Sequence, residues 1–248
     1  MKILVTAKRV TDPEMKIKIK SDGSGIELSS MKFKVNPFDE IAIEEALRIK
    51  EAMGGEVVIV SICSEDAQLE IRSGLAMGGD RGILVMTEED PDSDAVARIL
   101  VKLVEDEKPD IVLMGKQAVD IDDNQSAQIL AEYLGWGQAC FASKIEIQES
   151  KARVHREVDG GTEVVEIDLP GIISTDLRLN EPRYAKLPDI LKAKKKEIKQ
   201  INVSELGVDI TPKVVIKNFT EPPQRQAGRI VEDVAELVTA LKEEAKII

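Results

Sequence analysis

Residues 110–134 read DIVLMGKQAVDIDDNQSAQILAEYL, and this stretch decides how the rest of the chain is interpreted. Residues 110–114 form a short apolar run typical of a buried parallel strand, and residues 127–134 carry apolar side chains at helical spacing. Residues 115–126 are therefore a turn from a strand to a helix. In open α/β sheets, ligands bind beyond the carboxyl ends of the strands, where helix N-termini offer free N–H groups to phosphate. The stretch predicts a nucleotide site.

The composition of the turn leaves a second interpretation open. Gly115 would let the backbone approach a ligand closely, and the polar residues 120–124 could bond ribose hydroxyls or cap the helix. Neither GxGxxG nor GxxxxGK[ST], the usual phosphate motifs, occurs here. On these residues alone, an acidic surface loop with a good helix cap is favoured over a nucleotide site.

Composition bounds the class of protein. A chain of 248 residues can bury a large core, and an aromatic content of 3% predicts that this core is aliphatic. The net charge of −12 argues against nucleic acid and anionic membranes as partners. No run approaches the roughly 20 apolar residues of a membrane span, and the chain opens directly into a strand. We therefore expect a cytoplasmic protein rather than a mitochondrial one, with Cys63 and Cys140 as reduced thiols.

The first half of the chain alternates strands with helices. Strands are predicted at residues 3–7, 56–62, 82–86 and 110–114, and helices at residues 37–53, 65–77, 93–107 and 127–134. The first of these helices is expected to have Asn36 as its N-cap and Pro37 at its first position. Residues 16–35 are expected to form a hairpin excursion around a turn at residues 21–25. This rhythm predicts a doubly wound, mostly parallel sheet. Right-handed crossovers would bring several strand ends to one edge, near the helix that begins at Asn36.

The rhythm changes after Trp136. Extended segments at residues 141–148, 153–158 and 162–168 predict an antiparallel meander, from which residues 170–175 return to the main sheet. A polar, proline-containing stretch at residues 176–188 predicts an exposed functional loop, followed by a short helix at residues 189–196. Residues 197–229 show little periodicity, and an amphipathic helix is predicted at residues 231–248. We expect an α/β domain at residues 1–196 and, at residues 197–248, an arm along another subunit, or else a disordered linker.

Several blocks resemble one known family. VHREVDGG at residues 154–161 and DLRLNEPRYAKLPDILKAKKK at residues 176–196 are similar to the signature of electron transfer flavoprotein β (small) subunits. Further blocks resemble that family in the same order: VNPFDEIAIEEA at residues 35–46, GLAMGGDRG at residues 74–82, residues 115–126, and Asp209 with PPQR at residues 222–225. The resemblance runs through the whole chain.

The resemblance implies a heterodimer with a larger α subunit, which holds most of one FAD. It also implies that the pair carries electrons from acyl-CoA and related dehydrogenases to a membrane quinone oxidoreductase. In the conventional branch of the family the β subunit binds AMP. The positions that match the AMP motif are Thr6, Asn36, Pro37, Phe38, Asp39, Ile62, Gly115, Lys116, Gln117, Ala118, Val119, Asp120, Ile121, Asp122, Asp123, Asn124, Gln125 and Ser126. Thr6, Ile62 and Pro13 stand where relatives carry Ala, Cys and Tyr.

The same resemblance places Phe38 and Glu157 near the FAD, with Glu157 approaching an arginine of the α subunit. Leu187 matches the anchor leucine of the partner-recognition loop, and Tyr184, Pro188 and Lys192 lie beside it in the sequence. An exposed leucine held by a proline and flanked by charges suits a small transient interface. Without the resemblance, Glu157 is a solvated strand carboxylate and Leu187 belongs to a capped turn.

Two other functions stay open. In the bifurcating branch of the family the β subunit holds a second FAD in place of AMP and reacts with NADH, whereas DDNQS at residues 122–126 resembles the conventional pattern. An ATP-using enzyme of similar fold would need a Gly-rich phosphate loop and carboxylates for Mg²⁺, but KRVT at residues 8–11 contains no glycine. We therefore expect an electron-carrier subunit with no catalytic reaction of its own and no metal site.

Overall fold

A nine-stranded sheet carries most of the chain. The computed structural model describes residues 1–88, 90–225 and 227–248. The strands lie in the order β11–β5–β4–β1–β6–β10–β7–β8–β9, and every neighbouring pair from β11 to β7 is parallel. The parallel strands are β1 (Lys2–Thr6), β4 (Glu56–Cys63), β5 (Arg81–Met86), β6 (Ile111–Gly115), β7 (Gly137–Gln148), β10 (Gly171–Thr175) and β11 (Ile198–Asn202). The predicted doubly wound, mostly parallel fold is confirmed.

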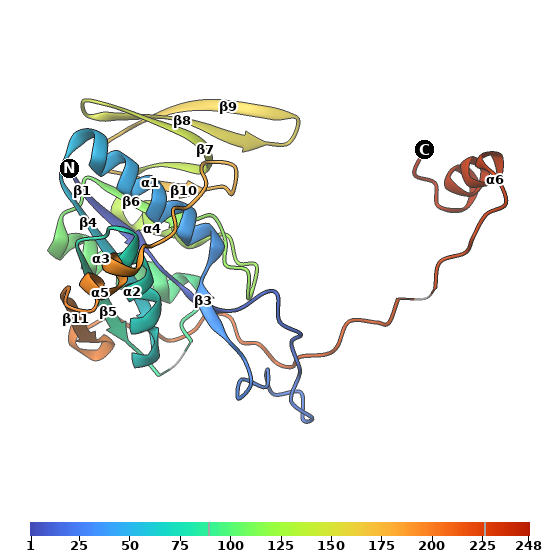
Figure 1. The fold of residues 1–248 in the computed structure, drawn as a ribbon, viewed down its shortest axis with the longest axis horizontal. Helices are drawn as coiled ribbons and strands as arrows, with labels where there is room; N and C mark the ends of the chain where they lie inside the picture. Colours follow the sequence, from blue (N-terminus) through green and yellow to red (C-terminus); the bar gives the residue numbers. More distant parts are fainter. Residues whose placement is uncertain (89, 226) are drawn as a thin grey trace. The chain divides into compact units, whose positions relative to one another are not determined.

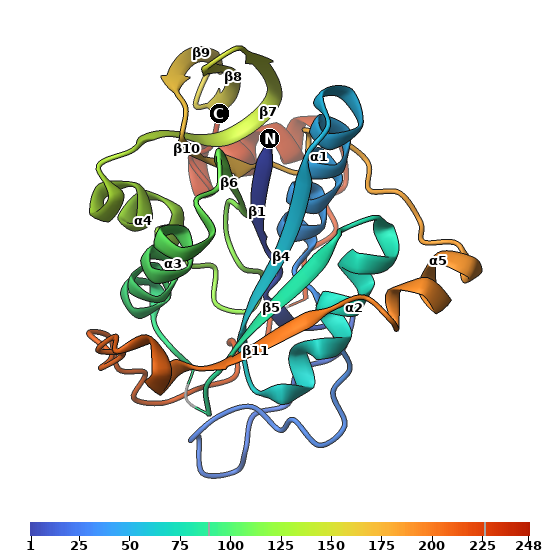
Figure 2. The ribbon, with the colours of Figure 1, turned by 90° about the vertical axis from the view of Figure 1, so that its left-hand side faces the viewer.

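Helices cover both faces of this sheet (Figure 2). On one face lie α1 (Pro37–Met53) and α2 (Gln68–Met77, preceded by a 3-10 turn at Glu65–Ala67), and on the other lie α3 (Ser93–Glu107) and α4 (Ser126–Leu134). Successive strand residues point to opposite faces, so Ile3 and Val5 join the α1–α2 core whereas Leu4 joins the α3–α4 core. Burial on both faces is why these strands are continuously apolar.

The order of the strands reverses at β1. The chain adds β4 and β5 on one side of β1 and then β6 on the other. The connections after β1 and β6 therefore leave the sheet on opposite faces. In open α/β sheets ligands bind in a crevice between two such connections, and the region at the carboxyl ends of β1 and β6 is called the crevice below.

The antiparallel extension agrees with the predicted meander. β8 (Lys151–Val158) and β9 (Gly161–Asp168) pair antiparallel with β7 and with each other (Figure 1), and β10 then returns to the parallel sheet between β6 and β7. The first of these strands begins at Gly137, four residues before the predicted start, because β7 first runs parallel to β10.

The predicted hairpin at residues 16–35 forms only beside its predicted turn. Its only bridge in the described chain is between Ile19 and Ile26, and the strand β3 (Phe33–Val35) pairs instead with β2 (Arg9–Thr11). Alternation at residues 16–20 gives no buried face, since Ile17 is exposed, and an isolated two-stranded ribbon without such a face is marginal. The Arg9 guanidinium instead lies over the Phe33 ring, 3.6 Å from its centroid.

Regular structure continues beyond residue 196. Residues 197–229 show little periodicity in the sequence, whereas the structure has β11 beside β5 and a 3-10 helix, Val203–Leu206, with an Asn202–Glu205 capping box. Within β11 only Ile201 is buried, because an edge strand packs few side chains, and this hides the pattern. Gln226, in the same stretch, lies outside the described residues. The α5 helix, Leu187–Ala193, starts two residues before its predicted position.

Contacts divide the chain into two compact units. Residues 1–18 and 27–216 form the first, and residues 19–26 and 217–248 form the second. In the second unit, α6 (Val234–Thr239) runs into a π-helical turn at Ala240–Glu244, which together are shorter than the helix predicted at residues 231–248. Its cap is Asp233, which accepts a hydrogen bond from the Glu236 N–H at 2.8 Å. Among the described residues, no helix combines the length and apolarity that crossing a bilayer requires.

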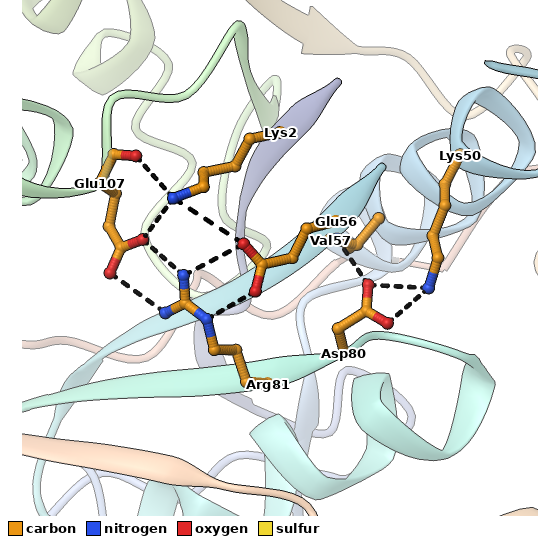
Figure 3. A network of polar contacts seen from close by, with 7 residues as sticks. All are labelled: Lys2, Lys50, Glu56, Val57, Asp80, Arg81 and Glu107. Atoms are coloured by element: carbon orange, nitrogen blue, oxygen red, sulfur yellow. Dashed lines mark hydrogen bonds and ion pairs between the residues drawn. The ribbon is translucent and has the colours of Figure 1, made fainter. Parts of the chain in front are cut away.

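An ion-pair network joins the amino ends of the central strands (Figure 3). Arg81, at the start of β5, binds Glu56 at 2.8 Å and Glu107 at 2.5 Å, and Lys2 binds the same Glu107 at 3.2 Å. Hydrogen bonds from Arg81 and Lys2 hold the pKa of the Glu107 carboxyl below its usual value despite partial burial. The network therefore joins the strands at the edge of the sheet opposite the crevice.

Candidate functional site

The Asp39 carboxylate joins three segments at the crevice. It accepts hydrogen bonds from Thr6 Oγ1 at 2.9 Å, from the Lys8 N–H at 2.8 Å and from the Gly115 N–H at 2.8 Å. These donors end β1 and β6, whereas Asp39 lies in the first turn of α1. Burial raises the pKa of this carboxyl, against the effect of the three donors. Asp39 therefore fixes the start of α1 against the two strands that border the crevice.

The Asn36 side chain reaches across the crevice. Its Nδ2 donates to the Gln117 carbonyl at 2.8 Å, and its Oδ1 accepts from the Val119 N–H at 3.2 Å. Asn36 occupies the N-cap position of α1, but its side chain does not cap the helix, because both of its polar atoms bind the loop at residues 117–119. Pro37 occupies the first helical position as predicted.

Gly115 has a packing role. A Cβ placed there would lie 2.7 Å from Phe38 Cβ, 2.8 Å from Asp39 Oδ1 and 2.9 Å from the Asp39 nitrogen. The glycine was predicted to let the backbone approach a ligand closely, whereas in the structure it makes room for the N-terminal turn of α1. Any side chain at position 115 would push α1 away from β6.

The loop at residues 116–125 is held by its own polar side chains. Asp120 pairs with the Lys8 ammonium at 2.8 Å, Asp123 accepts from Ser93 Oγ at 3.0 Å, and Asp122, at a positive φ of 57°, accepts from Gln117 Nε2 at 2.7 Å. None of these groups caps α4, and Gln125 at its N-cap position makes no side-chain cap hydrogen bond. The positive end of α4 is therefore open to an anion beside the loop.

The remaining predicted positions lie around the same edge. Ile62 is at the end of β4, next to β1, and packs against the α3–α4 core. Ala118 and Val119 are half-buried in the loop, Ile121 is exposed, Asn124 accepts from Gln128, and Ser126 begins α4. The topology therefore brings all the positions of the predicted AMP motif to the carboxyl edge of the sheet.

A second, open hollow of about 810 Å³ adjoins this edge. Both predicted flavin-facing residues, Phe38 and Glu157, line it. Its other lining residues are Lys116, Phe141, Val158, Asp159, Gly160, Asp176, Leu177 and Arg178. Phe38 lies in the same helical turn as Asp39, so one turn of α1 borders both the crevice and the hollow.

Lys116 connects the loop to the hollow. Its ammonium donates to Asp176 Oδ2 at 2.7 Å and lies 5.3 Å and 5.8 Å from the ring centroids of Phe38 and Phe141. Burial raises the pKa of the Asp176 carboxyl, but the bond from Lys116 and further donors outweigh this effect, and the pKa is lowered. The carboxylate is therefore ionised and paired at neutral pH.

Glu157 is paired within the chain. Its Oε2 accepts from Arg178 Nη1 at 2.5 Å, and the Arg178 side chain is 71% exposed. An incoming cation can therefore displace Arg178 into solvent at little cost, because exposed ion pairs contribute at most about 1 kcal/mol. Sequence reasoning missed Phe141, Asp176 and Arg178, and the only signal for Phe141 was the scarcity of phenylalanine, which occurs 4 times in the chain.

The predicted recognition residues lie around α5. Tyr184 is 97% exposed and Leu187, the first residue of α5, is 70% exposed. Pro188 follows in the first turn, and Lys192 pairs with Asp189 at 3.1 Å on the exposed surface. Tyr184 and Leu187 are thus available to a partner. In the part of the chain that the structure describes, no group of three or more acidic, histidine or cysteine side chains could bind a metal ion.

Comparison with known proteins gives a consistent result. A family model described as the electron transfer flavoprotein domain matches residues 26–206. The chain is 55% identical to electron transfer flavoprotein subunit beta of Bradyrhizobium diazoefficiens, with 100% of both chains aligned. It is 50% identical to the mitochondrial subunit beta of Arabidopsis thaliana, with 100% of both covered, and 48% identical to subunit beta of Homo sapiens, with 100% of this chain and 99% of the relative covered.

Proposed function

The chain belongs to the electron transfer flavoprotein β-subunit family, and on that premise we propose that it is the small subunit of a heterodimer that carries electrons from acyl-CoA and related dehydrogenases to a membrane quinone oxidoreductase. The observation that carries this proposal is the N-terminal turn of α1, in which Asp39 borders the crevice and Phe38 lines the hollow. One short turn would thus serve a nucleotide on one side and a flavin on the other. The chain itself would catalyse no reaction.

The crevice is proposed to hold a structural AMP. Residues 115–126 would bind it through backbone N–H groups and the open end of α4, with Thr6, Asn36 and Ile62 completing the wall. The acidic side chains of the loop are bonded to protein donors, which leaves backbone atoms to contact the phosphate. This arrangement supports a site that binds a nucleotide but does not transfer or hydrolyse its phosphate.

The hollow beside Phe38 is proposed to face an FAD that the α subunit mostly holds. When bound, the FAD would accept and release electrons one at a time. Glu157 would exchange its exposed partner, Arg178, for an arginine of the α subunit. Lys116 would place a positive charge at this wall, and Phe38 and Phe141 would exclude water from it.

Identification of the released nucleotide tests the proposal. The heterodimer, co-expressed with its α subunit, is purified, denatured with acid and analysed by chromatography and mass spectrometry. We expect one AMP and one FAD per heterodimer. Two FAD molecules would favour the bifurcating branch, and ATP that is turned over to AMP would favour an enzyme; either result would contradict the proposed function.

Leu187 is proposed to anchor the donor dehydrogenase, with Tyr184, Pro188 and Lys192 around it. Leu187→Ala should slow reduction of the heterodimer by an acyl-CoA dehydrogenase about thirtyfold, since truncating a buried anchor side chain costs about 2 kcal/mol. Leu69→Ala is the matched control, because Leu69 is also 70% exposed but lies on α2. Equal rates for the two variants would exclude Leu187 as the anchor.

Residues 197–248 are proposed to include an arm that packs on the α subunit. Several of its apolar side chains are exposed, among them Val215, which is 75% exposed, and Ile230, which is 99% exposed. Such side chains are typical of a surface that a partner covers. A cytoplasmic location is also a proposal and not a finding, because the relatives include one that is named as mitochondrial.

A further inference from the structure

Glu44 is a buried carboxylate on the flank of α1 that faces the recognition loop. Only 2% of the surface of Glu44 is exposed. Glu44 Oε2 accepts from Arg183 Nε at 2.8 Å and from the Arg183 backbone N–H at 3.1 Å, and Oε1 accepts from Arg183 Nη2 at 3.2 Å. Arg48, one turn along α1, donates to Oε1 at 2.7 Å. One carboxylate therefore fixes both the side chain and the backbone of Arg183.

This carboxylate is ionised at neutral pH. Burial raises the pKa of Glu44, but the hydrogen bonds from Arg183 and Arg48 outweigh burial, and the pKa lies below its usual value. Charge-assisted bonds to a buried carboxylate are strong, and removing one partner leaves the other charge poorly compensated. The contact between α1 and position 183 is therefore a firm one.

The same guanidinium also meets a second carboxylate, that of Glu51, at the surface. The Glu51 side chain is 59% exposed, whereas that of Glu44 is 3% exposed. Water can replace the contact with Glu51, so this ion pair contributes little to holding Arg183 in place. The chain thus offers two carboxylates on one arginine that differ mainly in burial.

Position 183 lies directly before the exposed recognition residues. Tyr184 follows it, and Leu187 begins α5 three residues later. Beyond α5, Lys196 Nζ donates to the Leu75 carbonyl at 3.0 Å, and Arg72 donates to the Ala193 carbonyl at 2.6 Å. The segment between residues 184 and 193 is therefore fixed at both ends, and Glu44 provides the fixed point nearest to Tyr184.

We propose that Glu44 is a positioning residue for partner recognition: through Arg183 it holds Tyr184 and Leu187 in the arrangement that a donor dehydrogenase binds. This inference rests on the proposed recognition role of Leu187. A segment that is already ordered loses less conformational entropy on binding, so the clamp raises affinity without touching the partner. Glu44 contacts no flavin-side residue, so it should leave the electron-transfer step itself unchanged.

The first test compares Glu44→Gln with Glu51→Gln in the full heterodimer. Glutamine preserves shape but removes the charge that Arg183 and Arg48 share. In Glu44→Gln we expect faster backbone hydrogen exchange at residues 183–190 and a rise of about tenfold in the KM of an acyl-CoA dehydrogenase for the heterodimer, with kcat and the FAD content unchanged. Glu51→Gln should change the KM less than about twofold. Arg183→Gln, which leaves Glu44 bonded to Arg48, should repeat the KM effect if Glu44→Gln does not fold.

The second test asks whether Glu44 acts through Leu187. In a double-mutant cycle, Glu44→Gln should add less than about twofold to the KM once Leu187 is already alanine, because residues that act through one another are not additive. Full additivity, or an unchanged exchange rate at residues 183–190, would overturn the clamp. If Leu187→Ala alone leaves the KM unchanged while exchange rises in Glu44→Gln, the recognition role of Leu187 is wrong but the positioning of the loop by Glu44 stands.

Discussion

Gly115→Ala tests whether the start of α1 must lie directly against β6 for the crevice to bind a nucleotide. The new Cβ would lie 2.7 Å from Phe38 Cβ and 2.9 Å from the Asp39 nitrogen. Ordinary contact begins at 3.4 Å, so the start of α1 must move by about 0.7 Å (3.4 − 2.7), since neither atom belongs to a rotatable side-chain end.

The displacement acts on a hydrogen bond as well as on packing. The bond from the Gly115 N–H to Asp39 Oδ1 is 2.8 Å long, and a shift of about 0.7 Å would stretch it beyond the range of normal N–H···O bonds. Overpacking of this kind destabilises by about 1–3 kcal/mol. The backbone position of Asn36, which bonds to the loop at residues 117–119, would shift with it.

The assay measures bound nucleotide per heterodimer and the Tm at a fixed protein concentration. We expect Gly115→Ala to lower the Tm by a few degrees and to lose most of its nucleotide. Gly74→Ala is the control, because its Cβ would meet the methyl ends of Ile59 and Ile43 at 2.5 Å and 3.2 Å, away from the crevice. The reasoning is refuted if Gly115→Ala keeps its full nucleotide content, or if Gly74→Ala loses nucleotide equally.

Three further changes probe the surrounding contacts. Glu107→Gln should lower stability by about 1–3 kcal/mol at pH 7. The pKa of Glu107 is lower in the folded chain than in the unfolded chain. The stability difference between the wild type and Glu107→Gln should therefore persist as the pH falls to the unfolded pKa, near 4.3, and disappear as the pH falls through the folded pKa. Measuring the Tm of both proteins against pH tests this. Lys116→Met should cost about 1–3 kcal/mol in denaturant unfolding, since Asp176 loses its cation, and an unchanged midpoint would contradict this pairing. Thr175→Val should cost about 1 kcal/mol in the same assay, because its buried Oγ1 donates to the Phe38 carbonyl at 3.0 Å.

The sequence predictions were accurate for the strands that are buried on both faces and less accurate elsewhere. Strands such as β4 and β6 were predicted because both of their faces pack against helices and their apolar runs are continuous. The edge strand β11 was missed because it shows one buried residue, Ile201. The pairing of β2 with β3 was missed because it depends on the Arg9–Phe33 contact, whose members lie far apart in the sequence.

The sequence likewise predicted some features of the candidate site and missed others. The sequence grouped Thr6, Asn36, Asp39 and residues 115–126 through topology and the family resemblance. It did not show that Asn36 bonds the loop rather than its own helix, or that Gly115 makes room for α1. Both depend on where α1 lies relative to β6, which local periodicity does not specify.

The sequence by itself determined the doubly wound fold and the family, and it predicted a site at the carboxyl edge of the sheet, because periodicity, turn residues and motifs are local properties of the chain. Only the tertiary structure decided that Asp39 binds two strand ends, that Lys116 pairs with Asp176, and that Glu44 holds Arg183 beside the recognition residues. Each is a contact between segments more than 30 residues apart, where the arrangement of buried charges depends on packing.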